Sequence, residues 1–138
     1  MNAMPINLQQ KFSLFDERWS PKVVAEMNDY QFKVVKLEGE FVWHRHVDTD
    51  ETFFVVDGAL TIALRGGGDD EDGDGDGDRE VHLAAGELFI VPKGIEHKPI
   101  ATTECKVLLI EPRGVPNTGD GPDDGDRHAR TAANDVWI

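Results

Sequence analysis

The chain of 138 residues has one cysteine, one tyrosine and no long apolar run. The single cysteine, Cys105, excludes an internal disulfide and is typical of a protein in a reducing compartment. No stretch approaches the ~18–20 consecutive apolar residues that a membrane helix needs. Residues 1–7 lack the basic and then apolar pattern of a signal peptide. These absences predict a soluble, cytoplasmic protein.

Positive charge is also scarce, with 14 Lys and Arg against 27 Asp and Glu and a net charge of −13 at pH 7. The excess is local, because residues 69–80 and 120–127 hold ten of the thirteen net negative charges. A nearly neutral body without a basic face argues against nucleic-acid partners. It argues equally against docking on anionic lipid. Length and a 39% apolar fraction predict one domain, 1–138.

The acidic loop, residues 66–80, has a pattern that resembles a calcium site. Asp72, Asp74, Asp76 and Gly77 match the first half of an EF-hand loop. The twelfth position, which requires a bidentate glutamate, is Leu83 in this register. Starting at Asp70 places Val81 there instead. The sequence therefore predicts a solvated loop.

Short alternating segments dominate the rest of the chain. Leu8, Phe12 and Phe15 recur at helical spacing after the capping pair Asn7 and Gln10, which predicts a short N-terminal helix that ends by Pro21. Alternating segments rich in Val, Ile, Phe and Thr predict strands. They are residues 32–37, 41–46, 52–56, 59–64, 81–83, 87–91, 96–101 and 106–111.

About eight short strands with little helix predict an all-β fold, either a closed barrel or a double-sheet jelly roll. Asp57-Gly58 predicts a hairpin turn, because both residues tolerate the positive φ that a type I′ turn needs. The barrel core is expected at about 31–111. A tail, residues 112–138, is rich in Gly, Pro and Asp and ends in apolar residues 136–138, which we expect to dock on the body.

Two blocks of polar residues carry the chemistry. His44 and His46 would share one face of a strand, because side chains alternate with period two. Glu51 would return beside them at the start of the next strand, and His97 follows a Pro-Lys-Gly turn far along the chain. Imidazoles with a carboxylate suit one divalent Mn, Fe, Co, Ni, Cu or Zn ion. His82 and His128 lack such partners and are expected at the surface.

The two blocks resemble the two motifs of the cupin superfamily. The first runs from Gly39 through His44, His46 and Glu51 to Gly58, and its leading glycine is one place closer than the family pattern has it. The second runs from Gly86 through Pro92 and Gly94 to His97, with Ala101 where the family has asparagine. The acidic loop lies between the blocks, where cupins vary most in length.

The resemblance implies a double-stranded β-helix barrel in which His44, His46, Glu51 and His97 bind the metal. It also implies a small-molecule ligand, and homodimers are common among small cupins. Related cupins with these ligands include oxygenases and isomerases, and this predicts a metal-dependent enzyme. The alternative is a non-catalytic protein that binds a metal or small ligand.

The neighbours of these four residues predict the character of the pocket. Val42, Phe53 and Val55 share the expected strand faces, so an apolar lining is predicted. Trp43 and Arg45 alternate with the histidines and should face away from them. Trp19 is expected to pack against the body. Cys105 begins an apolar run, which is typical of an inert buried thiol.

Overall fold

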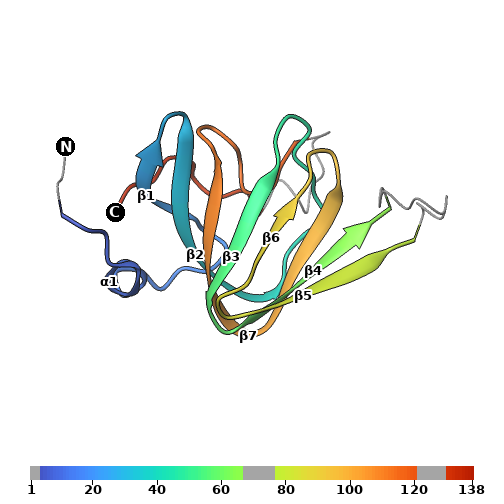
Figure 1. The fold of residues 1–138 in the computed structure, drawn as a ribbon, viewed down its shortest axis with the longest axis horizontal. Coiled ribbons are helices and arrows are strands. Elements are labelled where there is room, and N and C mark those ends of the chain that lie inside the picture. The colour runs from blue at the N-terminus through green and yellow to red at the C-terminus, as the bar shows by residue number, and fades with distance from the viewer. Residues whose placement is uncertain (1–3, 67–76, 121–129) are drawn as a thin grey trace.

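The computed structural model describes residues 4–66, 77–120 and 130–138. They form one short helix and seven strands, which confirms the predicted all-β fold with an N-terminal helix (Figure 1). In chain order the elements are α1 (Leu8–Phe12), β1 (Lys22–Met27), β2 (Tyr30–Glu40), β3 (Glu51–Asp57), β4 (Ala59–Arg65), β5 (Arg79–Ala84), β6 (Leu88–Val91) and β7 (Glu96–Pro112).

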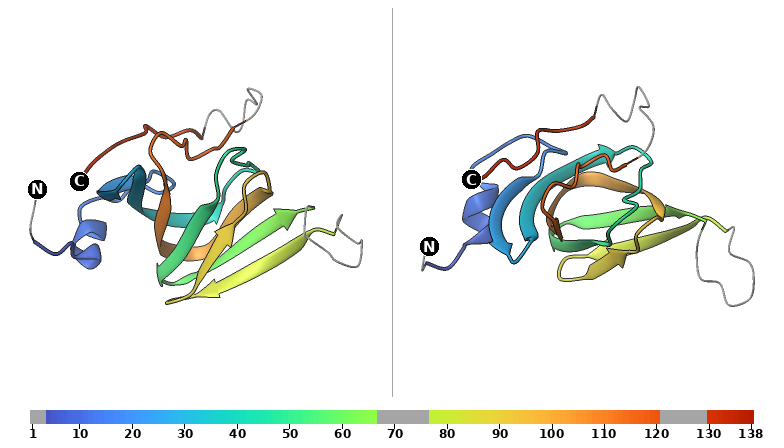
Figure 2. Two further views of the ribbon diagram at one scale, coloured as in Figure 1. Left: turned by 45° about the horizontal axis from the view of Figure 1, so that its top comes forward. Right: turned by 90° about the horizontal axis from the view of Figure 1, so that it is seen from above.

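The long strand β7 organises the barrel (Figures 1 and 2). Along one edge it pairs with β2, and along the other it pairs first with β4 and then with β3, always antiparallel. Beyond these, β6 pairs with β3 and β5 pairs with β4. The two strands predicted at 96–101 and 106–111 are parts of one strand, which runs from Glu96 to Pro112 and pairs with β2 on both sides of an irregularity between Leu37 and Gly39.

The predicted hairpin at Asp57-Gly58 is wrong. β3 and β4 do not pair with each other; both run antiparallel to β7, one after the other. Gly58 is the corner where the sheet bends from one layer to the next. Its φ is +92°, and an added Cβ would lie 3.0 Å from the carbonyl oxygen of Glu104 on β7. A corner and a hairpin turn need the same positive φ, so the dipeptide alone does not distinguish them.

β1 was not predicted; it pairs antiparallel with β2 at the edge of the sheet. Val23, Val24 and Ala25 are consecutive apolar residues, so this segment lacks the alternation by which a strand is recognised. The register with β2 shifts between Val23 and Ala25, and a strand with such a shift does not keep strict alternation. A turn at Asn28, with φ of 58°, leads into β2. The period-two signal is weakened where a bulge interrupts a strand.

The helix α1 is shorter than predicted but capped as expected. The Asn7 side chain accepts a hydrogen bond of 3.0 Å from the backbone N–H of Gln10. Phe15 lies beyond the helix end, yet it is buried with Phe12 against Val24 and Val34 on the outer face of the sheet. The helix therefore covers part of the sheet opposite the barrel interior.

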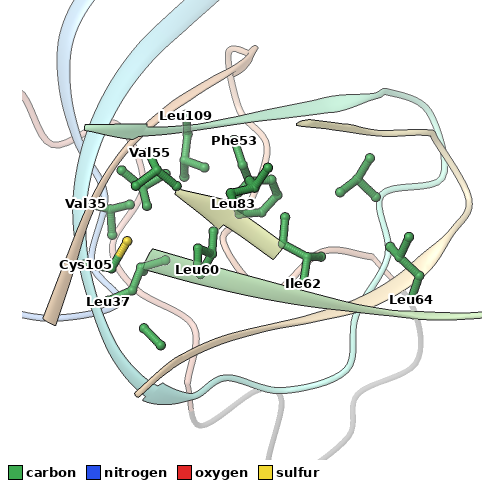
Figure 3. Packing of buried hydrophobic residues seen from close by; sticks show 13 residues of the cluster. Val35, Leu37, Phe53, Val55, Leu60, Ile62, Leu64, Leu83, Cys105 and Leu109 are labelled. Atoms are coloured by element: carbon green, nitrogen blue, oxygen red, sulfur yellow. The ribbon is translucent and has the colours of Figure 1, made fainter. Parts of the chain in front are cut away.

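The main core fills the space inside the barrel (Figure 3). Val55, Ile62 and Val107 are fully buried. Cys105 is buried with them, and burial raises the pKa of its thiol to about 11, with the nearby Asp57 adding to the effect. The thiol is therefore protonated and packed, as predicted.

The C-terminal segment docks on β1, as predicted. The backbone N–H of Val23 donates to the carbonyl of Val136 at 2.7 Å, and that of Ile138 donates to the carbonyl of Val23 at 3.1 Å.

The calcium-like pattern falls largely on residues 67–76, and His128 falls within residues 121–129; both ranges lie outside the described residues. Among the described helices, none is long and apolar enough to cross a membrane. The extent of the single domain, 1–138, stays a prediction.

Candidate metal centre

The segment that carries His44 and His46 is not the regular strand predicted at 41–46. It makes isolated bridges at two points, His44 with His97 and Arg45 with Asp120. Side-chain alternation nevertheless persists. His44 and His46 are buried, whereas Arg45 is exposed. Trp43 faces outward, as predicted, with the Arg65 guanidinium 3.8 Å from its ring centroid.

The fold brings all four predicted residues together in the barrel. Glu51 is the first residue of β3, and His97 lies near the start of β7, paired with Leu64 of β4. One donor atom from each of His44, His46, Glu51 and His97 lies within 4.8 Å of all the others, and all four residues are buried. Oε1 of Glu51 is 3.2 Å from Nε2 of His46 and 3.4 Å from Nε2 of His97.

Backbone carbonyls orient two of the rings. Nδ1 of His44 lies 2.9 Å from the carbonyl oxygen of Val42, and Nδ1 of His97 lies 2.9 Å from that of Ile95. A carbonyl only accepts, so each Nδ1 carries the proton and each Nε2 keeps a lone pair. Nε2 of His46, Nε2 of His97 and Oε1 of Glu51 are buried without a hydrogen-bond partner. Buried polar atoms rarely stay unpaired, so this donor set fits a borderline divalent metal.

The charges in the site have the form that metal binding needs. Burial lowers the pKa of His44 to about 3, and His97 adds to this shift. Burial opposes ionisation of Glu51, but the imidazoles of His46 and His97 beside its carboxyl outweigh burial and hold the pKa of Glu51 well below its ordinary value. At neutral pH the site therefore offers a neutral His44 and an ionised Glu51.

A second buried carboxyl, Glu111, lies against Glu51 and was not predicted. Burial raises the pKa of Glu111 well above its ordinary value, and the neighbouring Glu51 raises it further, whereas Lys33 opposes the shift. Nζ of Lys33 is 3.0 Å from Oε1 of Glu111. The raised pKa favours the protonated, neutral form of Glu111 beside the ionised Glu51.

A narrow cavity of about 30 Å³ reaches the site at His44 and Glu51. Of the predicted lining residues, Phe53 borders it, whereas Val55 packs in the main core and Val42 contributes its carbonyl to His44. The lining is mostly apolar and comprises Trp19, Pro21, Val35, Leu37, Phe41, His44, Glu51, Phe53, Pro99, Leu109 and Asn117.

Sequence reasoning missed Trp19 and Phe41 as pocket residues. Their rings stack with centroids 4.7 Å apart, and Phe41 meets the His44 ring edge-on at 5.3 Å. The Arg130 guanidinium lies 5.0 Å from the Phe41 centroid. Trp19 precedes the predicted core and has a φ of 61°, so no periodic signal could have placed it at the site.

Comparison with known proteins identifies the family. A family model of the cupin domain matches residues 32–111 of this chain. The chain belongs to the cupin family. The match covers the segment from β2 to the end of β7 and contains all four clustered residues, so the barrel described above is a cupin barrel.

This cupin is similar to several known proteins. A crystal structure of a cupin-2 domain containing protein from Shewanella frigidimarina is 56% identical, has a TM-score of 0.68 and matches over 78% of this chain and 94% of that one. YdbB from Bacillus subtilis is 32% identical over 75 residues, which are 54% of this chain and 57% of that protein. The chain thus spans little more than half the length of this curated relative.

A larger enzyme shares the fold. Hydroquinone 1,2-dioxygenase from Sphingomonas, solved in complex with 4-nitrophenol, has a TM-score of 0.66 and is 22% identical. The match covers 79% of this cupin and 32% of that chain. At this identity the likeness shows a common barrel.

The acid stability of the metal-free cupin is expected to depend on these buried groups. His44 titrates at 6.5 when unfolded and at about 3 when folded, so the unfolded state binds the proton first and stability falls below pH 6.5 by ~1.4 kcal/mol per pH unit. Glu111 acts in the opposite direction above pH 4.5, because its raised pKa makes the folded state hold the proton.

We therefore expect the unfolding free energy to fall only gradually between pH 6.5 and 4.5, where Glu111 opposes His44, and to fall more steeply below pH 4.5, where Glu51 also takes up a proton on unfolding. Urea unfolding in the presence of a chelator, repeated across this range, measures it. Glu111→Gln removes the opposing group, so its stability should decline from pH 6.5 downward. Identical profiles for the two proteins would contradict this account.

Proposed function

We propose that this cupin binds one divalent transition-metal ion through His44, His46, Glu51 and His97. One observation carries the proposal: four buried donor atoms from distant parts of the chain lie within 4.8 Å of one another. Three of the donor atoms at this point have no hydrogen-bond partner. Three imidazoles and one carboxylate favour Mn, Fe, Co, Ni, Cu or Zn over calcium or magnesium, which prefer oxygen ligands.

We further propose that the bound ion serves a metal-dependent enzyme of the oxygenase or isomerase type, with oxygen chemistry favoured. Four protein ligands leave open positions on a six-coordinate ion, and such an ion can supply Lewis-acid or redox chemistry. The cavity meets the site at His44 and Glu51, and most of its lining is apolar. That lining suits O₂ or a small, partly hydrophobic substrate better than a sugar phosphate.

The chain's own residues would have simple roles in such a reaction. The three histidines and Glu51 hold the ion, and Glu51 also lowers its net charge. Phe41 and Phe53 line the approach with rings that exclude water. Asn117 is engaged elsewhere, because its side chain donates to the carbonyls of Trp19 and Arg130, each at 3.1 Å. The fold shared with a hydroquinone dioxygenase agrees with oxygen chemistry but does not identify a substrate.

A non-catalytic metal or small-ligand binding protein is the second candidate, and the size of the cavity favours it. A volume of about 30 Å³ holds little more than one or two waters, since a single water needs ~10–15 Å³ on this scale. A substrate larger than O₂ would require the aromatic rings at Trp19 and Phe41 to move. Turnover therefore separates the two candidates.

Elemental analysis of protein purified without added metal tests the proposal first. We expect about one transition-metal ion per chain, because the four donor residues are already clustered and donor atoms of three of them have no hydrogen-bond partner. Oxygen uptake with small phenols as probes then follows. Metal-dependent uptake favours the enzyme, and bound metal without uptake favours the binding protein. Failure to retain or take up Fe²⁺, Co²⁺ or Zn²⁺ would refute the metal site.

Assembly and location complete the proposal. We propose a homodimer, and exposed apolar side chains on β6 support it: Leu88 and Ile90 are 57% and 49% exposed. A small molecule is the proposed ligand, with neither nucleic acid nor membrane as a partner, in keeping with the net charge of −13. Location in the cytoplasm stays a prediction.

A further inference from the structure

We propose that Glu111, anchored by Lys33, is a positioning residue that fixes the carboxylate of Glu51 toward the three histidines. The inference rests on the metal site proposed above and adds to it a buried pair from two other strands. Lys33 lies on β2 and Glu111 near the end of β7, outside both polar blocks of the sequence.

Strand register places the three side chains on one face. Thr52 of β3 pairs with Ile110 of β7, so the next step brings Glu51 opposite Glu111. On the other edge of β7, Lys33 pairs with Leu109, two residues from Glu111. Directly opposite and diagonal neighbours on one face lie close enough to contact. A row Glu51, Glu111, Lys33 therefore crosses three adjacent strands.

The contacts in this row agree with the register. The side chains of Lys33 and Glu111 are 4% and 2% exposed, with Nζ 3.0 Å from Oε1. Lys33 also lies 3.5 Å from the carbonyl oxygen of Val115. Oε2 of Glu111 is buried and has no hydrogen-bond partner in the described chain. The register of β3 on β7 places the carboxyl of Glu51 on this side of Glu111. Glu111 is thus held on one side by an ammonium and faces Glu51 on the other.

Glu51 needs such support because it borders the cavity. Oε1 is presented to Nε2 of His46 and His97, and we expect the cavity that Glu51 and His44 both border to give the carboxylate room to turn. A contact from behind by Glu111 removes that freedom. Residues that orient a metal ligand typically contribute ~10–100-fold in metal affinity. A buried lysine and its carboxyl partner, by contrast, often stabilise a fold little more than apolar residues of the same size.

That difference yields a sharp test with the double variant Lys33→Met/Glu111→Met. It removes the Lys33 ammonium together with the Glu111 carboxyl that contacts it, so neither group is left buried without its partner and the barrel is expected to stay folded. We expect Co²⁺ binding to weaken ~10–100-fold and the visible d–d spectrum of the Co²⁺ protein to change. The single variant Glu111→Gln keeps the side-chain length and offers a permanent N–H donor for Glu51, and should retain the wild-type spectrum.

Lys36→Met is the matched control. Lys36 is also a buried lysine of β2, but its Nζ lies 2.6 Å from the carbonyl oxygen of Phe15, outside the barrel interior. Its loss should leave Co²⁺ affinity and spectrum unchanged. Wild-type affinity and spectrum in the folded double variant would overturn the positioning role.

Crystal structures of the metal-free proteins separate this inference from the metal proposal. Failure of the wild-type protein to bind Co²⁺ would refute the proposed metal site but not the positioning role, which the metal-free structures still test. Oε1 of Glu51 should then still face His46 and His97 in the wild type and turn toward the cavity in the double variant. An unmoved Glu51 in the double variant would refute the positioning role by itself.

Discussion

Replacing His97 with alanine is expected to reduce the bound metal from about one ion per chain to background. Four-ligand zinc sites are worth ~10–16 kcal/mol, so one ligand corresponds to ~3–4 kcal/mol, or on the order of 10²–10³-fold in affinity. His97 is fully buried, and its Nε2 has no hydrogen-bond partner. The variant removes an unpaired polar atom, so we expect the barrel to fold. Glu51→Ala should lose the metal for the same reason.

Metal content at a fixed free concentration, with circular dichroism as the check on folding, measures this effect. His82→Ala is the matched control, because His82 lies on β5 with its side chain 70% exposed. It should bind metal as the wild type does. Full metal retention by both His97→Ala and Glu51→Ala would show that the four residues are not the ligands.

Replacing Gly119 with alanine is expected to disturb the metal site from outside the barrel. Gly119 has a φ of +73°, and an added Cβ would overlap the carbonyl oxygen of Arg45 and lie 3.0 Å from its carbonyl carbon. Arg45 separates His44 from His46. It also accepts a hydrogen bond of 2.8 Å from the N–H of Asp120. The alanine therefore has to push the backbone that carries both histidines.

Gly114→Ala provides the control for backbone strain. Gly114 has a φ of +91°, but nothing lies within 4 Å of an added Cβ. Both variants bear the cost of positive φ, of order 1–3 kcal/mol. Overpacking adds about 1–3 kcal/mol in Gly119→Ala alone. We expect only Gly119→Ala to lose metal affinity as well. Each 1.4 kcal/mol by which the displaced histidines weaken the binding free energy lowers the affinity about tenfold. Equal stability and affinity in the two variants, by urea unfolding and Co²⁺ titration, would contradict this.

The segment around His44 shows how far sequence patterns reach. The alternation of His44, Arg45 and His46 correctly predicted which side chains point inward, because that depends on extended backbone alone. A regular strand was wrong, because its partners are isolated bridges to His97 and Asp120. Asp120 lies in a Gly- and Pro-rich stretch that carries no periodic signal. The partner of the ligand segment was therefore invisible in the sequence.

The corner at Gly58 and the row behind Glu51 mark the same limit. The dipeptide Asp57-Gly58 predicts a positive φ but does not predict whether the chain forms a hairpin or a corner. The pairing of both β3 and β4 with β7 decides this. Glu111 and Lys33 are two of several charged residues on β7 and β2, and nothing in the sequence distinguishes them from the others. Only the register across three strands places them beside Glu51.

By itself, the sequence determined the all-β class, the short capped helix and the identity of the four clustered residues. These follow from spacing and residue type, which are local properties of an extended chain. The tertiary structure alone decided the bent path of β3 and β4, the aromatic approach at Trp19 and Phe41, and the pair Lys33 and Glu111. Each of these depends on contacts between residues distant in the chain, which no local periodicity records.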